Sequence, residues 1–337
     1  MSGACTATDT CIDSAIGVVV IGRNEGERLK HCLSSVGSLA SRVVYVDSRS
    51  RDGSAEWARK QGVAVVELDS AKPLSAARAR NEGFRRLTEI APELSLVQFL
   101  DGDCEMDRGW LSAAHGLLTS RPEVAAVCGR LRERFPEHSI YNMLCEMEWN
   151  GPVGETRSTG GNAMMRCSAF RQVNGYREDL IAGEEPELCV RLRAGGWKIW
   201  RLGDEMGLHD AAITRFGQWW KRAVRGGHAF AQGAWLHGAP PERHCVAETR
   251  RAVLWGAVLP LAILSLAAIH PAWLMLALAY PLQVLRLAVR GGIGDRERRW
   301  RALFLVIARF AEAQGVLKFW IGRLRRRSAA LIEYKQD

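Results

Sequence analysis

The sequence predicts an α/β fold: a mostly parallel sheet flanked by helices, followed by a C-terminal hydrophobic helical hairpin and an amphipathic helix. Three observations lead to this prediction. Short β-branched runs alternate with helix-like segments over residues 16–98, which is typical of βαβ units. Two long uncharged segments lie near the C-terminus, at 252–269 and 272–285. A later segment, 303–324, is apolar on one side only.

The first hundred residues contain the strand and helix patterns in alternation. Strands are expected at residues 16–21, 42–46, 63–68 and 96–100, and helices at 25–39, 54–61 and 75–87. In a parallel sheet, ligands bind outside the carboxyl ends of the strands. Asp47 and Asp101 each follow a strand, so we expect them to line one cleft. Residues 110–203 have a mixed pattern, with a short helix expected at 186–194, and are expected to form the second wall.

Composition limits the class of protein. The chain has 337 residues, and its hydrophobic content of 47% excludes a mainly disordered protein. A net charge of +9 predicts an anionic partner such as a nucleotide, nucleic acid or lipid surface. The basic residues concentrate near the C-terminus without a nucleic-acid motif, so we expect no nucleic-acid partner. Nine irregularly spaced cysteines, with no C-x-x-C pair, indicate reduced thiols in the cytosol.

The two uncharged segments are near the lower length limit for membrane-spanning helices. Lys and Arg flank the pair and are absent from the turn, so a hairpin at about 252–289 with both ends cytoplasmic fits the positive-inside rule. The amphipathic helix, at about 302–327, is expected to lie on an anionic membrane surface. Arg286 and two prolines also fit a buried hairpin of a soluble domain, and shallow re-entrant insertion is a third interpretation. The expected parts are a disordered leader at 1–14, an α/β domain at 15–235 and a membrane-associated helical region at 236–337.

The strand at 96–100 ends in Asp101-Gly102-Asp103, which concentrates negative charge at the edge of the sheet. Neighbouring carboxylates repel each other unless a cation lies between them. Hard divalent ions such as Mg²⁺ and Mn²⁺ take oxygen ligands and often bring a phosphate as co-ligand. The segment therefore indicates a metal site, although Asp-Gly-Asp also forms ordinary surface turns.

Three other segments carry candidate chemistry. Gly22 to Gly26 opens a helix whose N–H groups could meet a nucleotide, although Asn24 could simply cap the helix. Glu184-Glu185 at a helix start could supply a general base or only favourable helix charges. His209 could be a metal ligand or a structural histidine.

The order of these motifs resembles the family 2 glycosyltransferases. The motifs, spread over about residues 16–225, are Asn24-Glu25, Val46-Asp47 through Asp52-Gly53-Ser54, Ala79-Arg80-Asn81-Glu82-Gly83, Asp101-Gly102-Asp103, Gly160-Gly161-Asn162 and Gly183-Glu184-Glu185 before Leu188-Cys189-Val190-Arg191-Leu192. The resemblance implies a GT-A fold, which is Rossmann-like, and a membrane-attached enzyme of the non-processive type. It also implies a nucleotide-sugar donor and Mg²⁺ or Mn²⁺ as cofactor.

The resemblance also implies roles for individual residues. Donor contacts would come from Asn24, Glu25, Asp47, Arg80, Asp101 and Asp103, with Asp47 at the base, Asp101 at the ribose or diphosphate, and Arg80 supporting the cleft or meeting phosphate. Metal ligands would come from Asp103, Asp101 and His209. Glu185 would be the catalytic base in a single inverting displacement, a role that Glu184 could also fill because the usual Glu-Asp is Glu-Glu here.

The expected function is thus metal-dependent, inverting transfer of a sugar to a hydroxyl acceptor, lipid-linked or a cell-envelope glycan, at the cytoplasmic face of the inner membrane. Trp219 and Trp220 stand where processive synthases have Gln-x-x-Arg-Trp, without that spacing, so a processive synthase is disfavoured. These tryptophans could line the acceptor site, belong to a core or face a membrane. The alternatives are a sugar-phosphate nucleotidyltransferase and a non-catalytic, nucleotide-binding membrane scaffold.

Overall fold

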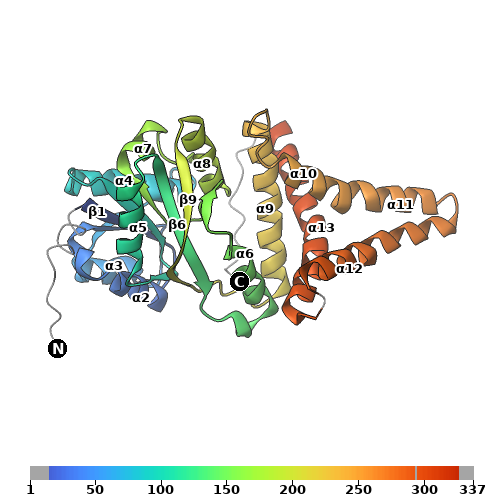
Figure 1. Ribbon diagram of the computed structural model, residues 1–337, viewed down its shortest axis with the longest axis horizontal. Helices are drawn as coiled ribbons and strands as arrows, with labels where there is room; N and C mark the ends of the chain where they lie inside the picture. Colours follow the sequence, from blue (N-terminus) through green and yellow to red (C-terminus); the bar gives the residue numbers. More distant parts are fainter. Residues whose placement is uncertain (1–14, 293, 326–337) are drawn as a thin grey trace. The chain divides into compact units, whose positions relative to one another are not determined.

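The computed structural model describes residues 15–292 and 294–325 (Figure 1). The leader expected at 1–14 lies outside the described residues. The described chain forms two compact units. Their members are residues up to 134, 146–178 and 184–211 in the first unit, and 135–145, 179–183 and the residues from 212 onward in the second. The expected boundary at 235 differs from this division because a long helix that begins at Phe216 belongs to the helical second unit.

The first unit is built on one sheet of nine strands. Its spatial order is β3 (Ala64–Glu67), β2 (Val43–Asp47), β1 (Ile16–Gly22), β4 (Leu96–Asp101), β8 (Ala163–Arg166), β6 (Val124–Glu133), β9 (Lys198–His209) and β5 (Cys104–Met106), with β7 (Gly154–Thr156) also paired to β9. The first four strands are parallel, as predicted. The other half is mixed, because β8 runs antiparallel to both β4 and β6. The predicted fold class is confirmed, and in the other half of the sheet β6 and β9 also pair in parallel.

Helices pack on both faces of this sheet. They are α2 (Glu27–Ser35), α3 (Ser54–Lys60), α4 (Ala76–Ile90), α5 (Trp110–Ser120), α7 (Cys167–Gln172) and α8 (Glu184–Ala194), with a 3₁₀ turn η1 (Gly37–Arg42) after α2. Alternate residues of β1 serve opposite faces, as the pleat of a strand requires. Val19 lies in one core cluster with Leu87 of α4. Val18 lies in the other cluster with Leu29 of α2 and Trp110 of α5.

The structure differs from the predicted helices in two places. The helix expected at 25–39 ends at Ser35, because Gly37 has a φ of 66° that a regular helix cannot contain. Helix α5 is absent from the predicted elements, since residues 110–120 are mostly apolar or small and show only a weak amphipathic pattern.

The strand register brings the predicted polar strand ends together. Gly22 at the end of β1 pairs with Asp47 at the end of β2. Its neighbour Ile21 pairs with Asp101 at the end of β4. Asp47 and Asp101 therefore lie at the same carboxyl edge of the sheet, on either side of β1, as expected of one shared cleft.

The second unit is helical. Its elements are the end of α6 nearest Ile140 (α6 spans Ile140–Trp149), α9 (Phe216–His237), α10 (Val246–Val253), a π-helical turn η3 (Leu254–Val258), α11 (Leu259–Ala267), a 3₁₀ segment η4 (Pro271–Leu278), α12 (Ala279–Gly291) and α13 (Arg296–Leu324). Helices α11 and α12 form the two legs of a hairpin (Figure 1). At its base the Tyr280 hydroxyl donates to the Trp255 carbonyl at 2.8 Å. The predicted hydrophobic hairpin is confirmed.

Two segments of this unit, 246–267 and 271–291, are long and apolar enough to cross a membrane by length and composition. Few of their residues are buried within the protein: Leu264 is 64% exposed and Met275 is 69% exposed. Such exposure disfavours the interpretation as a buried hairpin of a soluble domain.

The expected amphipathic helix exists as α13, but one face of it is covered by protein. A Cβ atom at Gly227 of α9 would lie 2.0 Å from the Glu312 carbonyl oxygen, and one at Gly315 would lie 2.0 Å from the Val224 carbonyl oxygen. The two glycines thus let the α9 and α13 backbones approach closely, and the buried α13 face includes Phe304 and Phe319. The α13 face that meets α9 is therefore buried within the protein, and contact of the rest of this helix with a membrane surface stays a prediction.

The two tryptophans of α9 differ in surroundings. Trp219 is buried and its ring packs at 4.8 Å from that of Phe304, which fits the core interpretation. The Trp220 indole N–H donates to the Gln314 side-chain oxygen at 2.9 Å. Both side chains thus join α9 to α13.

Candidate active site

Asp47 is held rigidly at the end of β2. It is 1% exposed, and its two carboxylate oxygens accept hydrogen bonds from the Tyr45 hydroxyl at 2.9 Å and from the Ser50 backbone N–H at 2.8 Å. Burial, with the Asp47 charge, raises the pKa of Tyr45, so this hydroxyl stays a donor. Each carboxylate oxygen keeps a further acceptor position. The predicted contact of Asp47 with a nucleotide base stays a prediction.

Asn24 links two loops at this edge. It has a left-handed φ of 55°. Its N–H donates to the Ser50 hydroxyl at 2.8 Å, and its side-chain oxygen accepts the Arg51 N–H at 2.8 Å. The alternative in which Asn24 caps the next helix is wrong, because the N-cap of α2 is Gly26, whose N–H donates to the Asp52 carboxylate at 2.8 Å. Glu25 lies beside it and pairs with Arg28 at 2.8 Å.

Arg80 of α4 is the centre of a buried ionic cluster. Its guanidinium is 3% exposed and meets three carboxylates: Asp101 at 2.8 Å, Glu184 at 3.1 Å and Glu185 at 3.0 Å. These groups come from α4, the end of β4 and the start of α8, so the fold joins distant segments here. One cation faces three acids, which leaves an excess of negative charge when all are ionised.

Glu185 carries the consequence of that excess. Burial and the neighbouring Glu184 charge raise its pKa, Arg80 opposes them, and the result is a pKa of about 7. A carboxylate that titrates near neutral pH can take a proton from a substrate hydroxyl efficiently. The sequence predicts a catalytic base at Glu184 or Glu185, and the raised pKa of Glu185 favours Glu185 for this role.

Gly161 and Asn162 shape this cluster, although the sequence analysis gave them no site role. A Cβ at Gly161 would lie 2.5 Å from an Arg80 guanidinium nitrogen and 2.6 Å from an Asp101 oxygen. The Asn162 side-chain oxygen accepts the Asp101 N–H at 2.7 Å, and its amide nitrogen donates to the Cys104 sulfur at 3.1 Å. The Gly-Gly-Asn segment is the sequence feature that could have indicated this role, since glycine allows the backbone to approach other groups closely.

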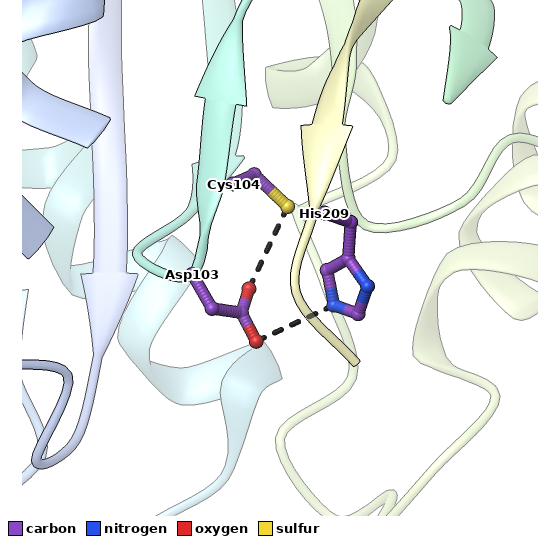
Figure 2. Close-up of side chains that lie close together, drawn as sticks. All are labelled: Asp103, Cys104 and His209. Carbon is purple, nitrogen blue, oxygen red and sulfur yellow. Dashed lines mark hydrogen bonds and ion pairs between the residues drawn. The ribbon is translucent and has the colours of Figure 1, made fainter. Parts of the chain in front are cut away.

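A second cluster contains Asp103, which lies two residues after Asp101, together with His209 (Figure 2). The Asp103 Oδ2 lies 3.3 Å from the His209 Nε2, and the Cys104 thiol lies 3.5 Å from the Asp103 Oδ1. The β5–β9 register places Cys104 opposite His209, which brings the aspartate and the histidine together. The predicted association of these two residues is thus present in the structure.

The donors of this second cluster fit a divalent metal ion. Ligand atoms of Asp103, Cys104 and His209 lie within 4.8 Å of one another. Carboxylate oxygen and imidazole nitrogen both ligate Mn²⁺ and related ions. Burial and the Asp103 charge raise the pKa of the Cys104 thiol, so the thiol stays neutral and is the poorest ligand of the three. Asp101, also predicted as a ligand, is not in this group and is bonded to Arg80.

Known proteins share both the sequence pattern and the fold. Residues 17–174 match the sequence model of glycosyl transferase family 2. The chain is 24% identical to glycosyltransferase AglE of Haloferax volcanii, over 66% of this chain and 74% of that protein. It is 26% identical to succinoglycan biosynthesis protein ExoA of Rhizobium meliloti, over 58% of this chain and 62% of that protein, slightly under two thirds of its length.

A solved structure extends the comparison to the fold. Mannosyltransferase PcManGT from Pyrobaculum calidifontis, in complex with GDP-Man and Mn²⁺, is similar over 90% of this chain and 86% of that chain, with a TM-score of 0.59 and 22% sequence identity. Residues 17–174, slightly under half of the chain, thus resemble glycosyl transferase family 2, and the likeness to the mannosyltransferase shows that the chain shares its fold, which is of the GT-A type.

Proposed function

We propose that the protein transfers a sugar from a nucleotide-sugar donor to a hydroxyl group of an acceptor, with inversion at the anomeric carbon. The observation that carries this proposal is Glu185, a base with a pKa of about 7 held beside Arg80 at the edge where Asp47 and Asp101 end their strands. The similarity to AglE, ExoA and the GDP-Man-bound mannosyltransferase supports it.

The proposed reaction is a single displacement. Glu185 accepts the proton of the acceptor hydroxyl while that oxygen attacks the anomeric carbon and the bond to the nucleotide diphosphate breaks. One such displacement inverts the configuration. Asp47 would accept hydrogen bonds from the nucleotide, and Asn24 with Glu25 would form the wall of its pocket. Asp101 and Arg80 would hold the ribose and diphosphate side of the donor.

A divalent ion, Mg²⁺ or Mn²⁺, fits the donors of the second cluster. Asp103 and His209 would hold it, whereas Asp101, the third ligand that the resemblance implied, is paired with Arg80. When bound, such an ion offsets the negative charge that develops on a leaving diphosphate. The Mn²⁺ in the mannosyltransferase complex supports a metal-dependent enzyme.

The helical unit supports a proposal for the location of the protein and for its acceptor. Its exposed apolar hairpin is proposed to anchor the protein in the inner membrane, with Arg250, Arg251 and Arg290 at the cytoplasmic face. A lipid-linked or cell-envelope glycan acceptor fits an enzyme held there. The name of ExoA, a succinoglycan biosynthesis protein, supports a glycan product.

A donor screen tests the reaction. Detergent-purified protein is mixed with Mn²⁺ and a panel of UDP- and GDP-sugars, and released nucleotide is measured. We expect release from at least one donor, and its loss in the Asp103→Ala variant. Turnover unaffected by Asp103→Ala and by a chelator would overturn the metal-dependent mechanism. Consumption of a nucleoside triphosphate with a sugar phosphate would favour the nucleotidyltransferase alternative, and donor binding without any turnover would favour the scaffold.

Membrane extraction tests the anchor separately. The protein should stay in the pellet after carbonate washing of membranes. Leu261 and Leu264 are 63% and 64% exposed on α11, so Leu261→Lys with Leu264→Lys should release it without loss of helical content. The matched control places two lysines at Glu56 and Glu93, surface positions of the first unit, and should remain in the pellet. Release of the unmodified protein by carbonate would contradict the anchor.

A further inference from the structure

Glu133 is a buried carboxylate that the proposed reaction does not use. It is the last residue of β6, and its side chain has no exposed surface. A buried carboxylate is costly unless it is paired and hydrogen-bonded. The identity of its neighbours therefore indicates what this acid does.

The neighbours of Glu133 belong to the end of β9. The parallel register places Glu133 opposite His209. Its Oε2 lies 3.8 Å from the His209 Nδ1 and accepts the Ala211 N–H at 3.1 Å. The backbone is tied at the same point, because the Arg134 N–H donates to the His209 carbonyl at 2.8 Å.

The two ring nitrogens of His209 thus face two different acids. Nδ1 faces Glu133 on β6, and Nε2 faces Asp103 at 3.3 Å on the other side. Histidines that ligate metals usually offer the N–H of the remote ring nitrogen to a carboxylate, which fixes both the tautomer and the ring orientation. The Glu133–His209–Asp103 arrangement has this form.

We propose that Glu133 is a positioning residue of the metal site. It accepts the Nδ1 proton of His209 and thereby keeps the Nε2 lone pair directed at an ion held with Asp103. The separation of 3.8 Å is longer than a hydrogen bond, so the proposal requires this distance to shorten when an ion is bound. This inference rests on the metal site of the proposed function.

Mn²⁺ binding by the full-length protein in detergent tests this role. Electron paramagnetic resonance measures free Mn²⁺, first with Mn²⁺ alone and then with GDP or UDP added. Glu133→Gln should weaken Mn²⁺ binding by about 10- to 100-fold, the usual loss for such a partner. The control is Glu205→Gln, which removes an acid from the same strand as His209 but whose side chain is 42% exposed and faces Arg130 and Arg132. It should stay within about twofold of the unmodified protein.

A double-variant comparison separates positioning from general damage. In a His209→Ala background, Glu133→Gln should weaken Mn²⁺ binding by less than about twofold further, because Glu133 acts through the ring. A full further loss in that background, or Mn²⁺ binding by Glu133→Gln equal to that of the unmodified protein, would overturn the inference. If circular dichroism shows that Glu133→Gln does not fold, Glu133→Asp replaces it. This variant keeps the negative charge but places the carboxylate further from His209. An intermediate loss of Mn²⁺ affinity is then expected. If the unmodified protein binds no Mn²⁺ with or without nucleotide, the proposed metal site itself fails.

Discussion

The acids around Arg80 and the acids around His209 face the same electrostatic difficulty and resolve it differently. In the first cluster a permanent cation is supplied by the chain, and the remaining excess of negative charge raises the pKa of Glu185. In the second cluster Asp103 and Glu133 both lie beside the His209 imidazole, which is charged only when protonated. We therefore expect the Arg80 cluster to supply a proton acceptor and the His209 cluster to bind a cation.

This difference divides the Asp101-Gly102-Asp103 segment into two functions. Asp101 is paired with Arg80, whereas ligand atoms of Asp103 and His209 lie close enough together to hold an ion. Metal dependence should therefore reside in the His209 cluster and be weak in the Arg80 cluster. Four predictions test this division, from the largest expected effect to the smallest.

Arg80→Met should have the largest effect, because it leaves three carboxylates in a buried site without their cation. We expect a loss of unfolding free energy of about 3–5 kcal/mol, measured by urea denaturation. The control Arg85→Met removes an arginine from the same helix whose side chain is 65% exposed, and should cost less than about 1 kcal/mol. A stable Arg80→Met protein would show that the three acids do not depend on this guanidinium.

Glu185→Gln should lower kcat by about 10²- to 10⁴-fold, because it removes the proton acceptor without removing bulk. Glu184→Gln, the matched control on the same turn, should lower it less. Affinity for Mn²⁺ should be unchanged in both, since neither acid belongs to the His209 cluster. In the unmodified protein, kcat/KM should rise with pH through about 7, where Glu185 loses its proton. A pH-independent kcat/KM between 6 and 8 would exclude Glu185 as the base.

The pH dependence of stability should change in the same variant. The pKa of Glu185 in the folded protein is raised to about 7, so its contribution to stability is full below its ordinary value near 4.5 and is lost as pH rises toward 7. Gln cannot ionise and avoids this loss. Relative to the unmodified protein, Glu185→Gln should therefore gain roughly 1–3 kcal/mol of unfolding free energy between pH 5 and pH 8. Parallel stability curves for the two proteins would contradict the shifted pKa.

Asp103→Asn should have the smallest effect on the metal-free protein, because it removes one of the two acids beside His209. Its thermal unfolding without metal should stay close to that of the unmodified protein. Mn²⁺ at about ten times its Kd should stabilise the unmodified protein by about 1.4 kcal/mol and the variant by much less. Asp101→Asn should keep the Mn²⁺ stabilisation. If both variants lose it equally, the two aspartates share the ion and the division of roles fails.

The sequence reveals the parallel half of the sheet because alternating strands and helices impose a known connection rule. That rule places Asp47 and Asp101 at one edge before any coordinates are considered. It does not reveal Glu133, because the pairing of β6 with β9 joins strands about 70 residues apart with no short-range pattern. The packing of α13 on α9 is also hidden, since it depends on Gly227 and Gly315 meeting the opposite backbone.

For the site residues, too, the sequence predicts some features and leaves others to long-range packing. The resemblance supplied Arg80 and Glu185 as candidates, but their shared ion pair arises only when α4 and α8 are brought together by the fold. The pKa of Glu185 depends on that burial and on Glu184, so residue type alone does not give it. Long-range packing is the part that sequence patterns leave open.

The side-chain amide of Asn162 holds the turn that contains Asp101 and Asp103. Its oxygen holds the backbone at Asp101 and its nitrogen holds the sulfur of Cys104, so one planar group spans the whole turn that contains both aspartates. A planar amide does not stretch. The backbone on both sides of Gly102 and Asp103 is therefore tied to one side chain of another strand end, so a substitution at Asn162 should disturb the positions of Asp101 and Asp103 together.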